Sequence, residues 1–144
     1  MNLLFDIGHP AHVHLFRNFI HYLKGNGHHI TVVTRQKDIT NVLLDYYQIP
    51  YLCISKPGSG LLGMSLELLE RDVKILQLYQ AHPFDASFGT SVSIGHFTFL
   101  KGTKSYSFNE DDDDIVPLYA LISYPFCTKI IMEHPLFYQT IQHK

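Results

Sequence analysis

Three histidines stand close together near the start of the chain, in the segment FDIGHPAHVHLF (residues 5–16). His9, His12 and His14 follow an apolar run that ends at Gly8. An imidazole can act as a general base, donate a hydrogen bond to a substrate oxygen, or bind a metal ion. The spacing therefore raises three hypotheses for this segment: a catalytic loop, a metal site, or a glycine turn in which the imidazoles only cap and make polar contacts.

The metal hypothesis rests on His12-Val13-His14, an HxH pattern that metal-dependent hydrolases often carry after a first strand. If a helix begins near His12, however, the His12 and His14 side chains point about 200° apart and cannot share one ion. We therefore predict no metal site here. His9 and His12 remain candidate catalytic residues, with capping as the alternative, and His14 is expected at the surface.

The loop around Gly8 also has the character of an anion site. It joins an expected strand to an expected helix, whose N-terminus carries a partial positive charge. Gly8 allows close backbone approach of a ligand. No other glycine stands between residues 6 and 24, so the loop is neither a GxGxxG dinucleotide fingerprint nor a phosphate-binding P-loop.

Two further segments carry polar groups that could contact a substrate. Thr90 and Ser91 follow a short expected strand, and their hydroxyls either bind substrate or cap the next helix. The run NEDDDD (residues 109–114) is a solvated loop, a helix cap through Asp114, or a ligand site. In the last case, Asp111 and Asp112 would hold a divalent ion or sugar hydroxyls.

Strands and helices are expected to alternate along the whole chain. Short apolar or β-branched runs bounded by turn residues predict the strands, and apolar residues at three- and four-residue steps predict the helices. This pattern indicates an α/β fold, a Rossmann-like doubly wound parallel sheet in a single domain over residues 1–144. The expected strands are 3–7, 28–34, 51–54, 85–91, 104–109 and 128–132, and the expected helices are 13–23, 38–47, 62–76, 92–100 and 115–124.

The segment after the turn SKPGSG (residues 55–60) has the strongest helical pattern. Its apolar stripe is expected to face the core, with charged pairs four residues apart on the exposed side. The pairs are Glu67 with Arg71 and Glu70 with Lys74, and the stripe consists of Leu62, Leu66, Leu69, Val73 and Leu76.

Composition narrows the class of protein. A net charge of −2 gives no reason to expect nucleic acid as a partner. The two cysteines, Cys53 and Cys127, form no CxxC motif, so reduced thiols and a cytoplasmic location are expected. No signal peptide is recognisable, and no apolar run reaches the roughly 18 residues that a membrane span requires.

The segment LLFDIGHPAHVHLFRNFIHYLKGNGH resembles an uncharacterised family of bacterial and archaeal glycosyltransferase-like proteins, catalogued as a domain of unknown function. The resemblance continues through the segments LLGMSLELLERDVKILQL, FGTSVSIGH and FNEDDDDIVPLYALISYPFCTKII. This family is similar to GT-B enzymes, which include the lipid II-forming N-acetylglucosaminyltransferase and the UDP-N-acetylglucosamine 2-epimerases.

The resemblance implies that the chain is the N-terminal half of a GT-B fold, which shapes the acceptor side of a cleft. The C-terminal half, which binds most of the nucleotide sugar, would lie outside this chain, and the isolated chain would be inactive. Carried over by position, the cleft would be lined by Gly8, His9, Pro10, Ala11, His12, Gly89, Thr90, Ser91, Asn109 and Glu110.

The implied reaction moves a sugar from a UDP-sugar to an acceptor in surface polysaccharide or glycolipid synthesis, without a metal or other cofactor. His9 or His12 would be the base or a contact to phosphate or hydroxyl. Two alternatives stay open: a UDP-sugar 2-epimerase and a non-catalytic binding domain. The resemblance also suggests peripheral membrane association of the full-length protein and self-association through the exposed cleft face. The loop has fewer glycines than that of the lipid II enzyme, so substrate identity does not carry over.

Overall fold

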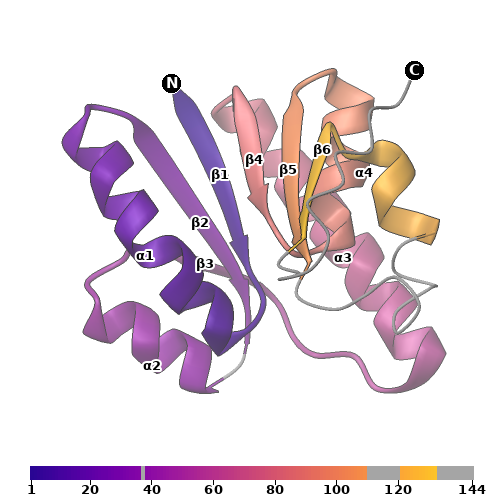
Figure 1. Cartoon of the computed structure of the whole chain (residues 1–144). Helices are drawn as coiled ribbons and strands as arrows, with labels where there is room; N and C mark the ends of the chain where they lie inside the picture. Colours follow the sequence, from indigo (N-terminus) through magenta and orange to yellow (C-terminus); the bar gives the residue numbers. More distant parts are fainter. Residues whose placement is uncertain (37, 110–120, 133–144) are drawn as a thin grey trace.

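The computed structural model describes residues 1–36, 38–109 and 121–132, and alternating strands and helices make up most of them (Figure 1). The strands are β1 (Asn2–Ile7), β2 (His29–Arg35), β3 (Leu52–Ser55), β4 (Ala86–Gly89), β5 (Lys104–Asn109) and β6 (Lys129–Met132). The α-helices are α1 (Pro10–Gly25), α2 (Asp38–Tyr46), α3 (Gly60–Ala81) and α4 (Val92–Lys101), and a 3₁₀ turn, η1, spans Tyr124–Phe126.

These strands form one parallel sheet in the order β3-β2-β1-β4-β5-β6. The chain winds outward from β1 in one direction and then, after α3, in the other. Helices α1 and α2 cover one face of the sheet, and α3 and α4 cover the other (Figure 1). The predicted Rossmann-like doubly wound sheet is confirmed. Of the helix expected over 115–124, residues 121–123 are helical, while 115–120 lie outside the described residues.

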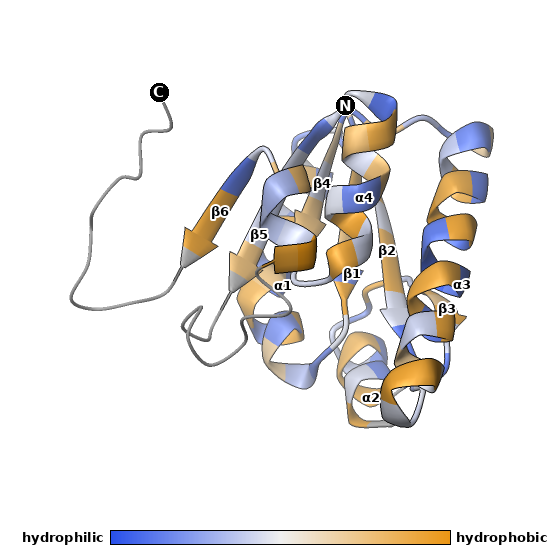
Figure 2. Cartoon of the chain, turned by 90° about the vertical axis from the view of Figure 1, so that its right-hand side faces the viewer, coloured by the Kyte–Doolittle hydropathy of each residue, from blue (hydrophilic) through white to orange (hydrophobic). Residues whose placement is uncertain are grey.

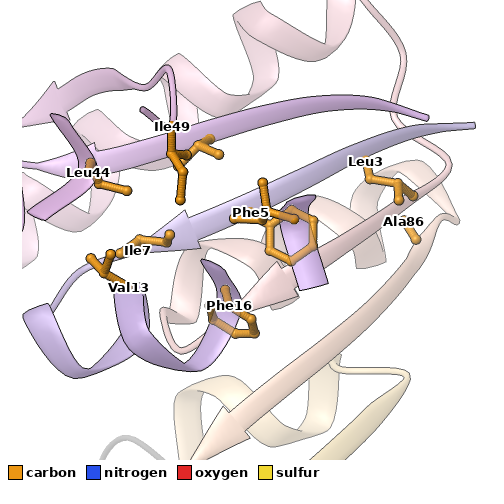
Figure 3. Close-up of a cluster of buried hydrophobic side chains, with 10 residues drawn as sticks. Leu3, Phe5, Ile7, Val13, Phe16, Leu44, Ile49 and Ala86 are labelled. Carbon is orange, nitrogen blue, oxygen red and sulfur yellow. The ribbon is translucent and has the colours of Figure 1, made fainter. Parts of the chain in front are cut away.

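The central strand β1 is buried on both faces, which is why its residues from Leu3 to Ile7 are apolar except for Asp6. Leu3, Phe5 and Ile7 point toward α1, where the rings of Phe5 and Phe16 meet edge to face with centroids 5.4 Å apart (Figure 3). Leu4 points the other way, into a cluster with Ile75 of α3 and other buried side chains. Burial of each such large apolar side chain contributes about 1.5–3 kcal/mol.

The orientation of α3 differs from the sequence prediction. The expected core stripe is largely exposed: Leu62 is 82% exposed, Leu66 67% and Leu69 62%. The buried positions of α3 are Arg71 and Ile75. Figure 2 shows apolar segments of α3 at the outer surface of the domain. A hydrophobic pattern cannot anticipate this orientation, because the face that packs on the sheet contains an arginine.

Of the two ion pairs predicted within α3, one forms and the other does not. Glu70 and Lys74 form the expected i,i+4 pair, with 2.6 Å between Oε1 and Nζ. Arg71 instead bonds to Asp6 of β1, and Glu67 bonds to Arg35 at the end of β2. In the part of the chain that the structure describes, no helix is both long and apolar enough to cross a membrane.

Candidate functional site at the carboxyl ends of the strands

The loop after β1 forms the N-terminal cap of α1. His9 occupies the N-cap position, and its Nδ1 accepts a hydrogen bond from the backbone N–H of Ala11 at 3.3 Å. Pro10 follows at the first helical position, where its missing N–H costs nothing. His9 is exposed at this edge. The capping contact that the sequence left open is therefore present, and it fixes the His9 ring at the mouth of the loop.

His12 lies one turn further along α1 and connects two loops. Its Nδ1 shares a hydrogen bond with Oγ1 of Thr90, 2.9 Å away, in the loop that follows β4. The rings of His9 and His12 have centroids 5.7 Å apart. Because β1 and β4 are adjacent parallel strands, their following loops meet at one edge. The fold thus brings together His9, His12 and Thr90.

Ser91 follows Thr90 but faces inward. Its hydroxyl donates to Oδ2 of Asp6, so the group predicted to contact substrate is already engaged within the domain. The adjacent Gly89 is held tightly against β1: a Cβ there would lie 2.7 Å from the backbone oxygen of Asp6. Only glycine allows this approach, which sets the position of the Thr90-Ser91 loop beside α1.

Beneath these loops lies a buried ion pair that the sequence analysis missed. Arg71 is 5% exposed and Asp6 is 0% exposed. One Arg71 nitrogen, Nη2, donates to Asp6 Oδ1, and Nη1 donates to Ser55 Oγ at 2.8 Å. Burial alone lowers the pKa of the Arg71 guanidinium, but the carboxylates of Asp6, Glu67 and Asp72 outweigh burial and raise it. Arg71 is therefore a fixed positive charge under the carboxyl edge of the sheet.

Glu67 extends this network to the second and third loops. Its Oε1 accepts from Ser55 Oγ at 3.1 Å, and its Oε2 accepts from the backbone N–H of Gly58 at 2.9 Å and from Arg35 Nη2 at 3.3 Å. The Asp6–Arg71–Glu67 network thus ties the ends of β1, β2 and β3 to α3. The sequence signal for it was Asp6 itself, since a carboxylate inside an apolar strand requires a buried partner.

The structure gives less information about the roles of the other predicted site residues. Gly8 is half-buried, and a Cβ there would meet only Arg35 Cδ at 3.8 Å, so the protein itself does not require a glycine. Asn109 ends β5, while Glu110 and Asp111 lie outside the described residues. His14 is exposed and its ring lies against Tyr47. Among the described residues, no three His, Cys, Asp or Glu side chains are placed to hold a metal ion.

Comparison with known families then places the sequence. The model of a family described as "Protein of unknown function (DUF354)" matches residues 1–141. The chain belongs to this family. No curated protein sequence matches the chain. Membership in the DUF354 family confirms the resemblance that the segment around Gly8 and His9 indicated.

Solved structures with the same fold include enzymes that act on nucleotide sugars. MurG of Acinetobacter baumannii has a TM-score of 0.71 at 14% identity, over 96% of this chain and 42% of MurG. UDP-GlcNAc 2-epimerase of Neisseria meningitidis, bound to UDP-GlcNAc, has a TM-score of 0.71 at 10% identity, over 90% and 39%. Anabaena Alr3699/HepE, in complex with UDP and glucose, has a TM-score of 0.62 at 17% identity, over 90% and 37%.

These likenesses establish the fold at identities too low to carry an activity across. The chain has the Rossmann-like architecture of one half of a GT-B protein, and it spans about two fifths of the length of the structures that it matches. Ligands of such open α/β sheets bind beyond the carboxyl ends of the strands. His9, His12 and Thr90 all lie at that edge.

Proposed function

We propose that this chain is the acceptor-side, N-terminal half of a GT-B type glycosyltransferase-like protein. The full-length protein would transfer a sugar from a UDP-sugar to an acceptor in surface polysaccharide or glycolipid synthesis. The observation that carries the proposal is the 2.9 Å hydrogen bond between His12 and Thr90, beside His9 at the carboxyl edge of the sheet. The family and the GT-B fold support the choice of reaction.

In this mechanism His12 acts as the general base. It takes the proton from an acceptor hydroxyl as the oxygen attacks the anomeric carbon of the donor, and the bond from that carbon to the UDP oxygen breaks. Thr90 fixes the orientation of the imidazole ring. No metal is required, because the positive end of the α1 dipole stabilises the negative charge on the phosphates. The backbone N–H of Ala11 already donates to His9, so it does not also donate to a phosphate oxygen.

His9 would contact a phosphate or a sugar hydroxyl. Its Nδ1 is occupied by the helix cap, which holds the ring in one orientation at the exposed mouth of the loop. Pro10 and Gly8 would shape the same surface. Of the remaining predicted contacts, Thr90 lies beside His12, while substrate roles for Ser91, Asn109, Glu110 and Asp111 stay predictions.

A UDP-sugar 2-epimerase is the second candidate, because the Neisseria epimerase matches this fold with the same TM-score as MurG, 0.71. A non-catalytic binding domain is the third. Product analysis separates the first two: a transferase joins the sugar to an acceptor, whereas an epimerase returns a C2-inverted UDP-sugar. Absence of any UDP-sugar binding by the full-length protein would leave only the third.

The exposed stripe of α3 supports peripheral membrane association as part of this proposal. Leu62, Leu66 and Leu69 are each more than 60% exposed on one helix, an arrangement typical of surfaces that bind a partner or a membrane. We expect the protein to act in the cytoplasm, where the thiols of Cys53 and Cys127, which form no disulfide, stay reduced.

Self-association through the cleft face is the alternative to membrane association. Sedimentation of the protein with and without lipid vesicles separates these two kinds of association.

Titration calorimetry of the full-length protein with UDP-N-acetylglucosamine tests the proposal. We expect saturable binding that His9→Ala weakens, with the fold unchanged by circular dichroism. His14→Ala is the matched control, since His14 lies exposed on the same helix but packs on Tyr47. No binding by the wild type, or equal effects of the His9 and His14 variants, would contradict the proposal.

A further inference from the structure

A concave site lies at the open edge of the sheet, apart from His9 and His12. It is a cavity of about 470 Å³ beside β3, which is the outermost strand on its side of the sheet. Its lining includes Asn41 of α2 and Glu70 and Lys74 of α3, two helices that cover opposite faces of the sheet (Figure 1). The polar residues that line it are Gln36, Asn41, Cys53, Ser55, Lys56, Glu70 and Lys74.

The charged groups of the cavity leave one positive charge unmatched. Lys74 Nζ donates to Glu70 Oε1 and to the backbone oxygen of Ile54, both at 2.6 Å. The Lys74 charge is therefore balanced by Glu70, and its position is fixed on the edge strand. Lys56 is exposed, and in the described parts of the chain its ammonium has no hydrogen-bond or ion-pair partner. Among the described residues that line the cavity, Lys56 is thus the one cation without a partner.

The remaining polar groups suit a ligand rich in hydroxyls. Asn41 lines the cavity, and its Oδ1 is buried and has no hydrogen-bond partner among the described residues. A buried amide oxygen without a donor is unfavourable, and a rotation of the Asn41 amide toward the cavity would let a ligand hydroxyl donate to it. The amide of Gln36 and the exposed thiol of Cys53 lie on the same walls. Amide side chains both donate and accept, as a sugar hydroxyl does.

We propose that this cavity binds a sugar that carries one negative group, a carboxylate or a phosphate, with Lys56 on the anionic group and Asn41 on a hydroxyl. The cavity volume lies within the range of about 300–1,000 Å³ that small-molecule sites occupy. The assignment rests on the proposed function, since it names the chemical class of the acceptor or of a regulator of the same protein.

The position of the cavity connects it to the histidine site. Ser55, at the end of β3, lines the cavity and also accepts a hydrogen bond from Arg71. Arg71 in turn holds Asp6, to which Ser91 donates beside Thr90. A chain of hydrogen bonds through Arg71 and Asp6 therefore connects the cavity to the loop that holds Thr90.

Chemical protection of Cys53 tests the site without using catalysis. The chain is treated with a maleimide, and the modification rates of Cys53 and Cys127 are followed separately by peptide mass spectrometry. Three probes are compared: glucuronate, glucose 6-phosphate and neutral methyl glucoside. We expect an anionic sugar to slow the modification of Cys53 in a saturable way, methyl glucoside to act only at much higher concentration, and Cys127 to be unaffected.

A charge-removing variant assigns the effect to Lys56. We expect Lys56→Gln to weaken protection by the anionic sugar by about tenfold to a hundredfold, the loss of one charged hydrogen bond. Lys104→Gln is the matched control, because Lys104 is exposed at the first residue of β5, which lies on the other side of β1 from β3. Protection by glucuronate alone identifies a carboxylate ligand, and protection by glucose 6-phosphate alone identifies a phosphate; either supports the site.

Three outcomes would overturn it: no protection by either anionic sugar, equal protection by methyl glucoside, or equal effects of the Lys56 and Lys104 variants. A different measurement, UDP-sugar binding, tests the proposed function. Loss of UDP-sugar binding by the full-length protein would contradict that function, whereas the rate of Cys53 modification would still report on the cavity.

Discussion

Replacement of Arg71 by methionine tests whether the buried ion pair holds the carboxyl edge of the sheet together. Methionine keeps an apolar side chain of similar length but removes the guanidinium. The Asp6 carboxylate, with 0% of its side chain exposed, would then lose its cation and, among the described residues, keep only the side-chain hydrogen bond from Ser91. Ser55 would lose a donor as well, although it still donates to Glu67.

The expected cost is large. Removing one partner of a buried ion pair costs about 3–5 kcal/mol, because an uncompensated charge remains in the interior. A domain of this size has only about 5–15 kcal/mol of stability in total. We therefore expect Arg71→Met to lower the free energy of unfolding by about 3 kcal/mol or more. The double variant Asp6→Asn/Arg71→Met should recover part of this loss, since neither charge remains.

Urea unfolding followed by circular dichroism measures both variants; the chain contains no tryptophan to serve as a fluorescent probe. Arg35→Met is the matched control. Its ion pair with Glu67 spans 3.3 Å, and the Arg35 side chain is 35% exposed, so its loss should cost less than about 1 kcal/mol. Glu67 also keeps its two other donors. Equal losses in the Arg71 and Arg35 variants would refute the central position given to Arg71.

Three further substitutions probe packing, exposure and burial. Gly89→Ala should destabilise the domain, because the new Cβ would lie 2.7 Å from the backbone oxygen of Asp6. Gly25→Ala is the control and should leave stability unchanged, because a Cβ there would have nothing within 4 Å. Thermal unfolding compares the two variants. Leu66→Ser should leave stability nearly unchanged, because the side chain is 67% exposed, and should weaken sedimentation with lipid vesicles; an unchanged vesicle-bound fraction would count against the membrane proposal. Burial raises the pKa of the Cys127 thiol, and this effect outweighs hydrogen bonds with Ser123 and two other serines, which lower it. As pH rises, the thiol therefore loses its proton in the unfolded chain at a lower pH than in the folded chain. Stability should therefore fall as pH rises through the ordinary thiol range near about 8.5, and Cys127→Ala should reduce this dependence.

The sheet could be predicted because its strands and turns carry local signals. The apolar run of β1 ends at Gly8, and the run of β2 is rich in β-branched residues, so both strands were expected within one or two residues of their observed ends. Regular alternation with helices then implied parallel pairing. The proximity of His12 and Thr90 followed from this topology, since loops after neighbouring parallel strands meet at one edge.

The Asp6–Arg71–Glu67 network could not be predicted in the same way. Periodicity identifies which residues share a helix face but not which face is buried, and hydrophobicity favoured the Leu66 face of α3 over the Arg71 face. The choice depends on a partner 65 residues away in the sequence, Asp6. Alternation along β1 places Asp6 on the same face as Leu4, but no local pattern shows which face of α3 will pack against that carboxylate.

The measurement that tests the account most directly is the rate of sugar transfer from UDP-N-acetylglucosamine by the full-length protein and its His12→Ala variant. A general base contributes about 10²–10⁴-fold, so His12→Ala should lower kcat by that factor while the fold and UDP-sugar binding persist. His14→Ala should retain the wild-type rate. A His12→Ala variant that transfers sugar as fast as the wild type would contradict the assignment of the catalytic base.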